Sequence, residues 1–158
     1  MVRATLVFVF RGNPSQHILL GDKKRGFAHG KVDGFGGKVQ EGESVAAAAS
    51  RELQEESGLV VSPTDLLPAG VLTFNFPNKE EWDQEVHVFI THCWQGEPAE
   101  SEEMRPHWIP IDEIPYERMW DDSHYWMPHV IAGGKIEARF TYAPDNHTVD
   151  HYSLNVVD

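Results

Sequence analysis

Three glutamates near the middle of the chain, Glu52, Glu55 and Glu56, are spaced as neighbours on one face of a helix. Residues three and four apart lie side by side on a helical surface, so these like charges repel one another. They also oppose the negative end of the helix dipole, because Gly58 predicts the C-terminus of that helix. A divalent cation would relieve the repulsion, and ligation by oxygen favours Mg²⁺ or Mn²⁺ over zinc. A solvated acidic helix end is the alternative interpretation.

The helix that carries these glutamates is predicted to run from about Ser44 to Ser57. Its first residue is a suitable N-cap, and the alanines at 46–49 have high helix propensity. The apolar stripe expected to face the core consists of Val45, Ala46, Ala49 and Leu53. Glu52 and Glu56 fall close to this stripe instead of facing away from it. A local pattern that breaks in this way is expected at a functional site, which favours the metal over the solvated end.

A glycine-rich segment precedes the helix, with five glycines in residues 30–42. Glycines allow backbone N–H and C=O groups to approach a phosphate or a metal closely, although a plain turn has the same composition. A glycine loop, clustered glutamates and an acidic chain together suggest a metal-chelated phosphoanhydride substrate, whose charge the metal screens.

Composition bounds the class of protein. The chain has 158 residues, which suits one compact domain, and 41% of them are hydrophobic, which suffices for a core. Thirteen Lys and Arg against 25 Asp and Glu give a formal charge of −12, which argues against a nucleic-acid polymer or an anionic membrane as partner. The single cysteine, Cys93, excludes a disulfide framework and fits a reducing cytosol. No apolar run approaches the ~18–20 residues of a membrane span.

The remaining pattern predicts an α/β fold with a mixed sheet that helices cover on both faces. Residues 4–10 form a continuous apolar run, as in a strand buried on both faces. The other predicted elements are strands at 17–21, 69–76 and 85–92, a short extended piece at 108–110, a helix at 123–131 and a hairpin of 135–142 with 148–155. The segment PNKEEWDQ between two of these strands is predicted to be a polar loop.

The glycine loop and the glutamate helix together resemble a complete Nudix box. Its positions are Gly37, Glu43, Arg51-Glu52-Leu53, Glu55-Glu56 and Gly58-Leu59. The resemblance implies a Nudix α/β/α sandwich with a mixed sheet, a single domain over residues 1–158, and hydrolysis of a nucleoside diphosphate linked to another group.

The resemblance extends from about Thr5 to the C-terminus. Over this range the chain is similar to the animal branch of the family, which acts on oxidised purine nucleotides. The resemblance rests on Lys23–Phe27, Gly34–Glu43, Val86–Phe89, Glu103–Pro106, Met119-Trp120 and Tyr125-Trp126. This branch implies hydrolysis of 8-oxo-dGTP and 2-hydroxy-dATP to the monophosphate and pyrophosphate, which sanitises the nucleotide pool, with N6-methyl-dATP as a further candidate substrate. It also implies a monomer that takes a small nucleotide in the cytoplasm, with a nuclear or mitochondrial pool as the alternative.

The same resemblance implies which residues bind the metal and which residues line the base pocket. The metal ligands would be the Gly36 carbonyl, Glu52, Glu55, Glu56 and Glu103. The base pocket would be lined by Thr5, Lys23, Phe27, Asp33, Phe74, Trp120, Asp121, Asp122 and Trp126. Among the catalytic residues, Glu56 would position or deprotonate water, with Glu103 as second candidate, and Arg51 would orient Glu43 and the cluster. The two tryptophans would stack on a base, although ordinary core aromatics are the alternative.

Three departures from the family pattern concern the base pocket. Asp33 stands where the family has Asn, and an ionised carboxylate only accepts hydrogen bonds. The run Trp120–Ser123 has lost a proline, so an ungapped alignment pairs the second family aspartate with its last residue, whereas a gapped one restores Asp121-Asp122. Ala4 would widen the pocket. These changes leave open the ranking of oxidised guanine against adenine. ADP-ribose, a dinucleoside polyphosphate or capped RNA as substrate, or a non-catalytic nucleotide-binding module, are the alternative functions.

Overall fold

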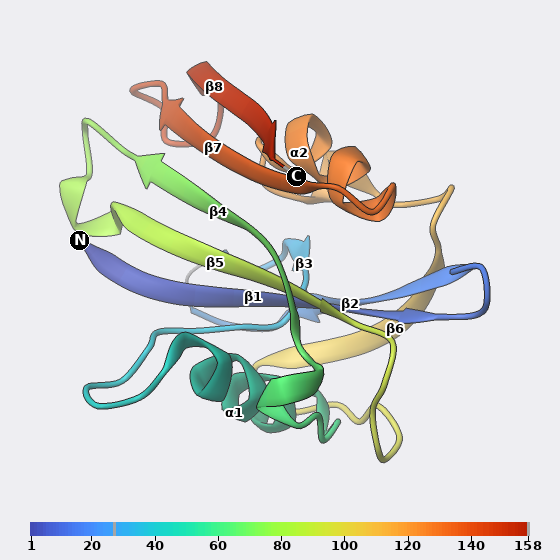
Figure 1. The fold of residues 1–158 in the computed structure, drawn as a ribbon. Helices are drawn as coiled ribbons and strands as arrows, with labels where there is room; N and C mark the ends of the chain where they lie inside the picture. Colours follow the sequence, from blue (N-terminus) through green and yellow to red (C-terminus); the bar gives the residue numbers. More distant parts are fainter. Residues whose placement is uncertain (27, 158) are drawn as a thin grey trace.

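The computed structural model describes residues 1–26 and 28–157 and places eight strands in one mixed sheet. The strands are β1 (Val2–Arg11), β2 (His17–Lys23), β3 (Val32–Asp33), β4 (Leu67–Asn75), β5 (Gln84–Thr91), β6 (Met104–Pro110), β7 (Lys135–Tyr142) and β8 (Val149–Val157). They follow the order β3-β2-β1-β5-β4-β7-β8, and β6 pairs with β2. The β1–β5 and β4–β7 pairs are parallel. The helices α1 (Val45–Ser57) and α2 (Ser123–Ile131) lie on opposite sides of the sheet (Figure 1), which confirms the predicted α/β sandwich.

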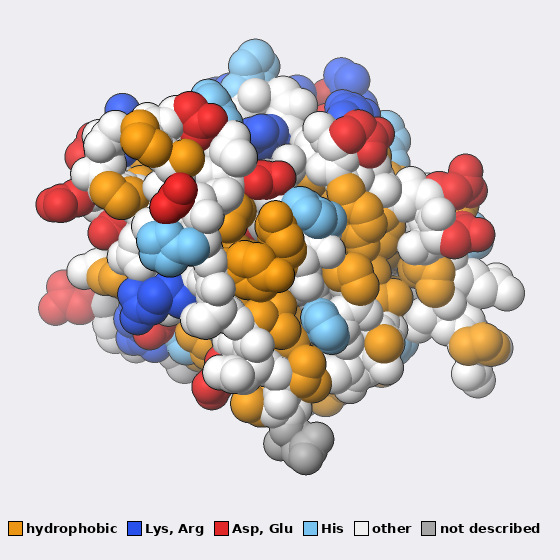
Figure 2. All heavy atoms as spheres, turned by 90° about the horizontal axis from the view of Figure 1, so that it is seen from above, with side chains coloured by type: hydrophobic (Ala, Val, Ile, Leu, Met, Phe, Trp, Pro, Cys, Tyr) orange, Lys and Arg blue, Asp and Glu red, His pale blue; other side chains and the backbone are white. Residues whose placement is uncertain are grey.

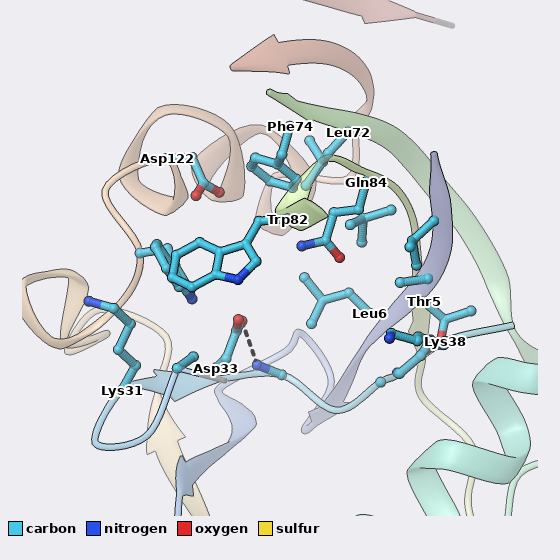
Figure 3. Close-up of a pocket in the computed structure, with 18 of the residues that line it drawn as sticks. Thr5, Leu6, Lys31, Asp33, Lys38, Leu72, Phe74, Trp82, Gln84 and Asp122 are labelled. Atoms are coloured by element: carbon cyan, nitrogen blue, oxygen red, sulfur yellow. Dashed lines mark hydrogen bonds between the residues drawn. The ribbon is translucent and has the colours of Figure 1, made fainter. Parts of the chain in front are cut away.

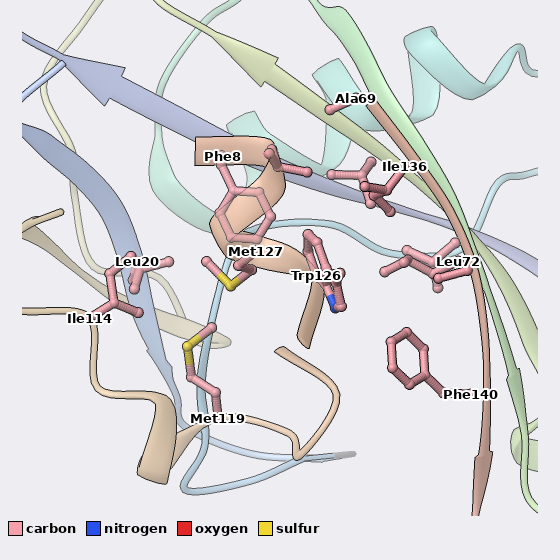
Figure 4. Close-up of a cluster of buried hydrophobic side chains, with 14 of the residues drawn as sticks. Phe8, Leu20, Ala69, Leu72, Ile114, Met119, Trp126, Met127, Ile136 and Phe140 are labelled. Atoms are coloured by element: carbon pink, nitrogen blue, oxygen red, sulfur yellow. The ribbon is translucent and has the colours of Figure 1, made fainter. Parts of the chain in front are cut away.

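Strand β1 contributes side chains to two separate cores. Val7 and Val9 belong to a cluster with Leu53 of α1. Phe8 belongs to the other cluster, which contains Trp126 of α2 (Figure 4). Successive side chains of a strand point to opposite faces, so the apolar run at 4–10 is buried on both faces as predicted.

Helix α1 has the limits that its sequence signals predict. The Ser44 hydroxyl accepts a hydrogen bond from the N–H of Ala47 at 3.1 Å. At the other end, Gly58 has φ 81° and donates its N–H to the Gln54 carbonyl. Few non-glycine residues adopt this left-handed conformation, so the glycine ends the helix at Ser57. The glutamates are therefore fixed in the last two turns.

Two strands differ from the sequence prediction. Strand β6 begins at Met104, whereas the sequence predicted a short piece at 108–110. Pro106 weakens the strand signal, but β6 lies at the sheet edge, where a missing backbone donor is tolerated. Strand β3, which pairs Asp33 with Gly21 of β2, lies inside the segment predicted to be a loop. It is too short to give a periodic signal.

The face that carries α2 is seen from above in Figure 2. Hydrophobic side chains lie towards the middle of this view, and acidic side chains lie around its rim. Among the residues that the structure describes, no helix is long and apolar enough to cross a membrane.

Candidate active site

A cavity of about 470 Å³ lies between the sheet, the glycine loop and the segment before α2 (Figure 3). We call one part the glutamate end, which is lined by Lys23, Gly36, Gly37, Lys38 and Glu56. The opposite part, the aromatic end, is lined by Phe76, Trp82, Trp120, Asp122, Trp126 and Tyr142. Ala4, Leu6, Leu72, Phe74 and Asp33 also line the cavity.

The glycine loop runs beside the first half of β1. Thr5 donates its N–H to the carbonyl of Gly37 at 2.9 Å. A Cβ added to Gly36 would lie 1.7 Å from the Thr5 carbonyl oxygen, so only glycine permits this close approach. A Cβ added to Gly37 would meet the Glu52 carboxylate at 2.4 Å. The two adjacent glycines therefore bring the backbone against both β1 and a glutamate of α1.

Glu56 is the buried carboxylate of α1, with 4% of its surface exposed. Its Oε1 accepts the N–H of Gly36 at 2.9 Å, and its Oε2 lies 3.6 Å from the Lys23 ammonium. Burial raises the pKa of Glu56 to about 7, although Lys23 and the Gly36 N–H oppose this rise. A carboxyl with a pKa near neutrality can both accept and release a proton at physiological pH.

Arg51 lies at the centre of the other glutamates. Its guanidinium binds Glu43 through two hydrogen bonds of 2.8 and 3.1 Å. It also donates to Glu52 at 2.9 Å and to Glu55 at 3.3 Å. The hydrogen bond to Glu43 is the main cause of the raised pKa of Arg51. The planar fork of arginine holds several carboxylates in fixed directions, which is an orienting arrangement.

Glu103, the residue before β6, approaches the same end but is more exposed. Its carboxylate lies 3.8 Å from Lys23 and 3.3 Å from Arg25. Within residues 1–26 and 28–157, no three His, Cys, Asp or Glu side chains are gathered as they would be around a metal ion. Cations separate the glutamates instead, because Arg51 holds Glu52 and Glu55, while Lys23 lies between Glu56 and Glu103.

At the aromatic end, Asp122 is buried and hydrogen-bonded on both carboxylate oxygens. Tyr142 donates its hydroxyl to Oδ1 at 2.5 Å, and Trp126 donates its indole N–H to Oδ2 at 2.8 Å. Burial raises the pKa of Asp122, and these two hydrogen bonds oppose the rise. Trp120 packs edge-on against Trp82 with ring centroids 6.5 Å apart, and the Lys31 ammonium lies 4.8 Å from its ring centroid.

Asp33 enters the cavity from the other side (Figure 3). Its Oδ1 accepts the N–H of the next residue, Gly34, at 2.8 Å. Burial raises the pKa of Asp33 to about 7, a rise that the hydrogen bond from Gly34 opposes. The cavity is thus lined by the buried carboxyls of Glu56 and Asp122 and by the partly buried carboxyl of Asp33, and each has different hydrogen-bond partners.

Most of the predicted base-pocket residues line this one cavity. They are Thr5, Lys23, Asp33, Phe74, Trp120, Asp122 and Trp126. Phe27 lies outside the described residues. Asp121 is not among the residues that line the cavity, and its carboxylate accepts the N–H of Val149 in β8 at 2.8 Å. Ser123 does line it, so the geometry agrees with the ungapped alignment. Trp126 is 1% exposed and forms a buried wall beside Phe8, 5.9 Å between ring centroids.

Several cavity residues were missed by the sequence reasoning. They are Lys31, Phe76, Trp82, Gln84 and Tyr142. Trp82 lies in the segment predicted to be a polar loop, and a tryptophan among charged residues was the available signal. Tyr142 gave no signal, because in the sequence it is simply the last apolar residue of an alternating strand.

Comparison with known proteins gives a consistent result. The NUDIX domain family matches residues 1–130. The chain is 45% identical over 154 residues to the oxidized purine nucleoside triphosphate hydrolase of Mus musculus, covering 98% of this chain and 94% of that protein. It is 44% identical over 154 residues to the protein of the same name from Danio rerio, covering 98% and 95%. The crystal structure of a mutator MutT protein from Bacillus halodurans has the same fold, with a TM-score of 0.84 at 24% identity over 98% of both chains.

Proposed function

Because this chain belongs to the Nudix family of hydrolases, we propose that it hydrolyses modified purine nucleoside triphosphates to the monophosphate and pyrophosphate. One observation carries the proposal: a single cavity joins a glutamate end suited to a triphosphate to an aromatic end suited to a base. The names of the mouse and zebrafish relatives support the same substrate class.

Nudix hydrolases use divalent metal ions, and we propose Mg²⁺ for this chain. The donor set fits such an ion, because it consists of oxygens from the Gly36 carbonyl, Glu52, Glu55, Glu56 and Glu103. The close approach of Gly37 to the Glu52 carboxylate places backbone and carboxylate oxygens in the same region. When bound, the metal would neutralise phosphate charge and acidify water. Arg51 and Lys23 would then each share their glutamates with the ion.

The chain's own residues supply positioning and proton transfer. A water attacks a phosphorus of the triphosphate, and the P–O bond to the pyrophosphate group breaks. Glu56 accepts the proton of this water, because it is the glutamate of α1 whose buried carboxylate lines the cavity. Lys23, 3.6 Å from Glu56, faces the negative charge of the phosphates. Arg51 orients the glutamates through Glu43 and does not touch the reacting atoms. Glu103 is the second candidate base.

At the aromatic end, the residues discriminate between bases. The indole of Trp120 provides a stacking surface, which contributes ~1–3 kcal/mol for each base. Asp122 accepts N–H groups from the base edge, because a carboxylate retains acceptor capacity after the bonds to Tyr142 and Trp126. Modified purines differ from ordinary ones in their edge N–H and C=O groups, so this end favours altered bases.

The test is pyrophosphate release from a panel of unmodified, 8-oxo, 2-hydroxy and N6-methyl purine nucleoside triphosphates, with Mg²⁺ and with chelator. We expect the modified nucleotides to have higher kcat/KM than the unmodified ones, and chelator to stop turnover. ADP-ribose and a dinucleoside polyphosphate serve as comparison substrates. Equal rates on unmodified nucleotides, or faster cleavage of either comparison substrate, would contradict the proposal.

A further inference from the structure

Asp122 is held by two hydrogen-bond donors, the Tyr142 hydroxyl and the Trp126 indole N–H. Neither of them readily accepts a hydrogen bond from the Asp122 carboxyl. An indole N–H only donates. The Tyr142 hydroxyl accepts the backbone N–H of Asp122 at 3.3 Å, which leaves its hydrogen directed at Oδ1 of the same residue. Burial and the nearby Asp122 charge raise the pKa of Tyr142, so the phenol keeps its proton. Both donors therefore stabilise the ionised form of Asp122.

Asp33 has weaker support for a negative charge. Its carboxylate receives the backbone N–H of Gly34. The charged groups around it are Asp122 at the start of α2, Lys23 on β2 and Glu56 on α1. The charge of Asp122 raises the pKa of Asp33 beyond the effect of burial, whereas Lys23 lowers it. Two carboxyl groups that share a poorly solvated site do not both ionise easily, and the less supported one keeps the proton.

We propose that Tyr142 is a positioning residue that keeps Asp122 as an ionised acceptor, so that the proton held in the cavity resides on Asp33. Asp122 then accepts hydrogen bonds from the N–H groups of a base in both protonation states of Asp33. The hydrogen bonding of Asp33 to a base varies, since its protonated form donates one hydrogen bond and its ionised form only accepts. This inference rests on the proposed function for its substrate, but the protonation of the two carboxyls does not.

The assignment predicts which base edge each form of Asp33 favours. A guanine-type edge presents the O6 acceptor, which pairs with a protonated Asp33. An adenine-type edge presents the N6 amino donor, which pairs with an ionised Asp33. The selectivity for 8-oxo-dGTP over 2-hydroxy-dATP should therefore fall as the pH rises through the pKa of Asp33. Glu56 acts on both substrates in the same way, so the pH dependence of the hydrolytic step itself cancels in the ratio of their kcat/KM values.

The experiment compares this ratio from about pH 6 to about pH 8 in the wild type, Tyr142→Phe and a matched control, Tyr152→Phe. Phenylalanine keeps the ring contact with Phe76, whose centroid lies 4.7 Å away, and removes only the hydroxyl. Tyr152 is an exposed tyrosine of β8. We expect the ratio to fall about tenfold over this range in the wild type and the control. In Tyr142→Phe the midpoint should move by about one pH unit, because the pKa of Asp122 rises and that of Asp33 falls.

A second measurement does not depend on any substrate. NMR titration of the side-chain carboxyl carbons reports the protonation of Asp33 and Asp122 directly. We expect the resonance of Asp33 to titrate near neutrality and that of Asp122 at lower pH, with Tyr142→Phe raising the pKa of Asp122 by about 1–2 pH units. Asp33→Asn should abolish the pH dependence of the ratio. It also provides a test if Tyr142→Phe proves unfolded by circular dichroism.

The outcomes separate the two proposals. A wild type that cleaves none of these nucleotides, but whose Asp33 titrates near neutrality and responds to Tyr142→Phe, would overturn the proposed function alone. Identical titrations in the wild type and Tyr142→Phe, or an Asp122 that holds the proton in the wild type, would overturn the assignment made here. A pH-dependent ratio that persists in Asp33→Asn would overturn it as well.

Discussion

At the glutamate end of the cavity, every lining residue except Lys23 lies between Gly36 and Glu56, a stretch in which a loop and a helix face each other. At the aromatic end, Phe76, Trp120 and Tyr142 come from three segments that are distant in the sequence. The first end is dominated by charges and backbone groups, and the second by aromatic rings around the buried carboxyl of Asp122. A sequence motif can therefore define the reaction while leaving the choice of base to residues that form no motif.

Replacing Glu56 by Gln should break the glutamate end most severely. Glutamine keeps the size of the side chain but cannot accept a proton from water, so kcat should fall by about 10²–10⁴-fold. Pyrophosphate release under saturating nucleotide measures this. Glu137→Gln, at an exposed position of β7, is the matched control and should retain the wild-type rate. Normal turnover in Glu56→Gln would remove this residue from the mechanism.

Gly37→Ala tests the contact between the loop and the helix. The added Cβ would lie 2.4 Å from the Glu52 carboxylate, which is a flexible group and would move aside. Since misplacement by about 1 Å can reduce rates about 10²-fold, we expect a loss of kcat near that size with the fold retained. Kinetics and a thermal melt together distinguish this from unfolding. An active Gly37→Ala would show that the position of Glu52 does not matter.

The buried carboxyls should make stability depend on pH. Burial raises the pKa of Asp33 from 3.8 to about 7 and that of Glu56 from 4.5 to about 7. Between these values the folded chain binds more protons than the unfolded chain, so the free energy of unfolding falls as the pH rises through about 4 to 7. We expect a loss of about 5 kcal/mol between pH 5 and pH 8, to which the two groups contribute about equally, measured by urea unfolding.

A variant and an added metal ion assign this loss of stability to the two ends of the cavity. Asp33→Asn should reduce the pH dependence of the free energy of unfolding by about half, because the amide does not titrate whereas Glu56 still does. Mg²⁺ should restore stability above neutrality, because it neutralises ionised glutamates at the other end. Stability that rises with pH over this range would contradict the raised pKa values. Arg51 lowers the pKa of Glu43. This carboxyl therefore makes the free energy of unfolding rise with pH, but only at lower pH.

Trp120→Ala should have the smallest effect and should act on the aromatic end alone. Loss of a stacking surface costs ~1–3 kcal/mol, so KM for modified purines should rise about tenfold or more with a smaller change in kcat. Trp94→Ala is the control, since this ring packs on Trp108 in the cluster that faces α1. If both variants raise KM equally, the effect is general and Trp120 does not bind the base.

The same contrast explains how much could be predicted from the sequence. Helix α1 and its glutamates were predictable, because capping residues and helical spacing are local signals. Asp121 was not, because whether it faces the cavity depends on the backbone N–H of Val149, which lies in another strand. Trp82 was missed because its loop has a polar composition, and β6 was shortened because Pro106 interrupts its pattern. Each of these errors concerns a residue whose role is set by a distant neighbour.

Strand β1 has a consequence for how such an enzyme can change. Ala4 and Leu6 line the walls of the cavity and belong to or pack on the α2-side core, whereas Val7 packs on the opposite side, towards α1. Thr5, between the first two, binds the carbonyl of Gly37. Neighbouring residues of β1 therefore contact different parts of the protein. During evolution or engineering, a single substitution at Ala4 or Leu6 can change the shape of the cavity while the contact between Thr5 and the glycine loop is kept.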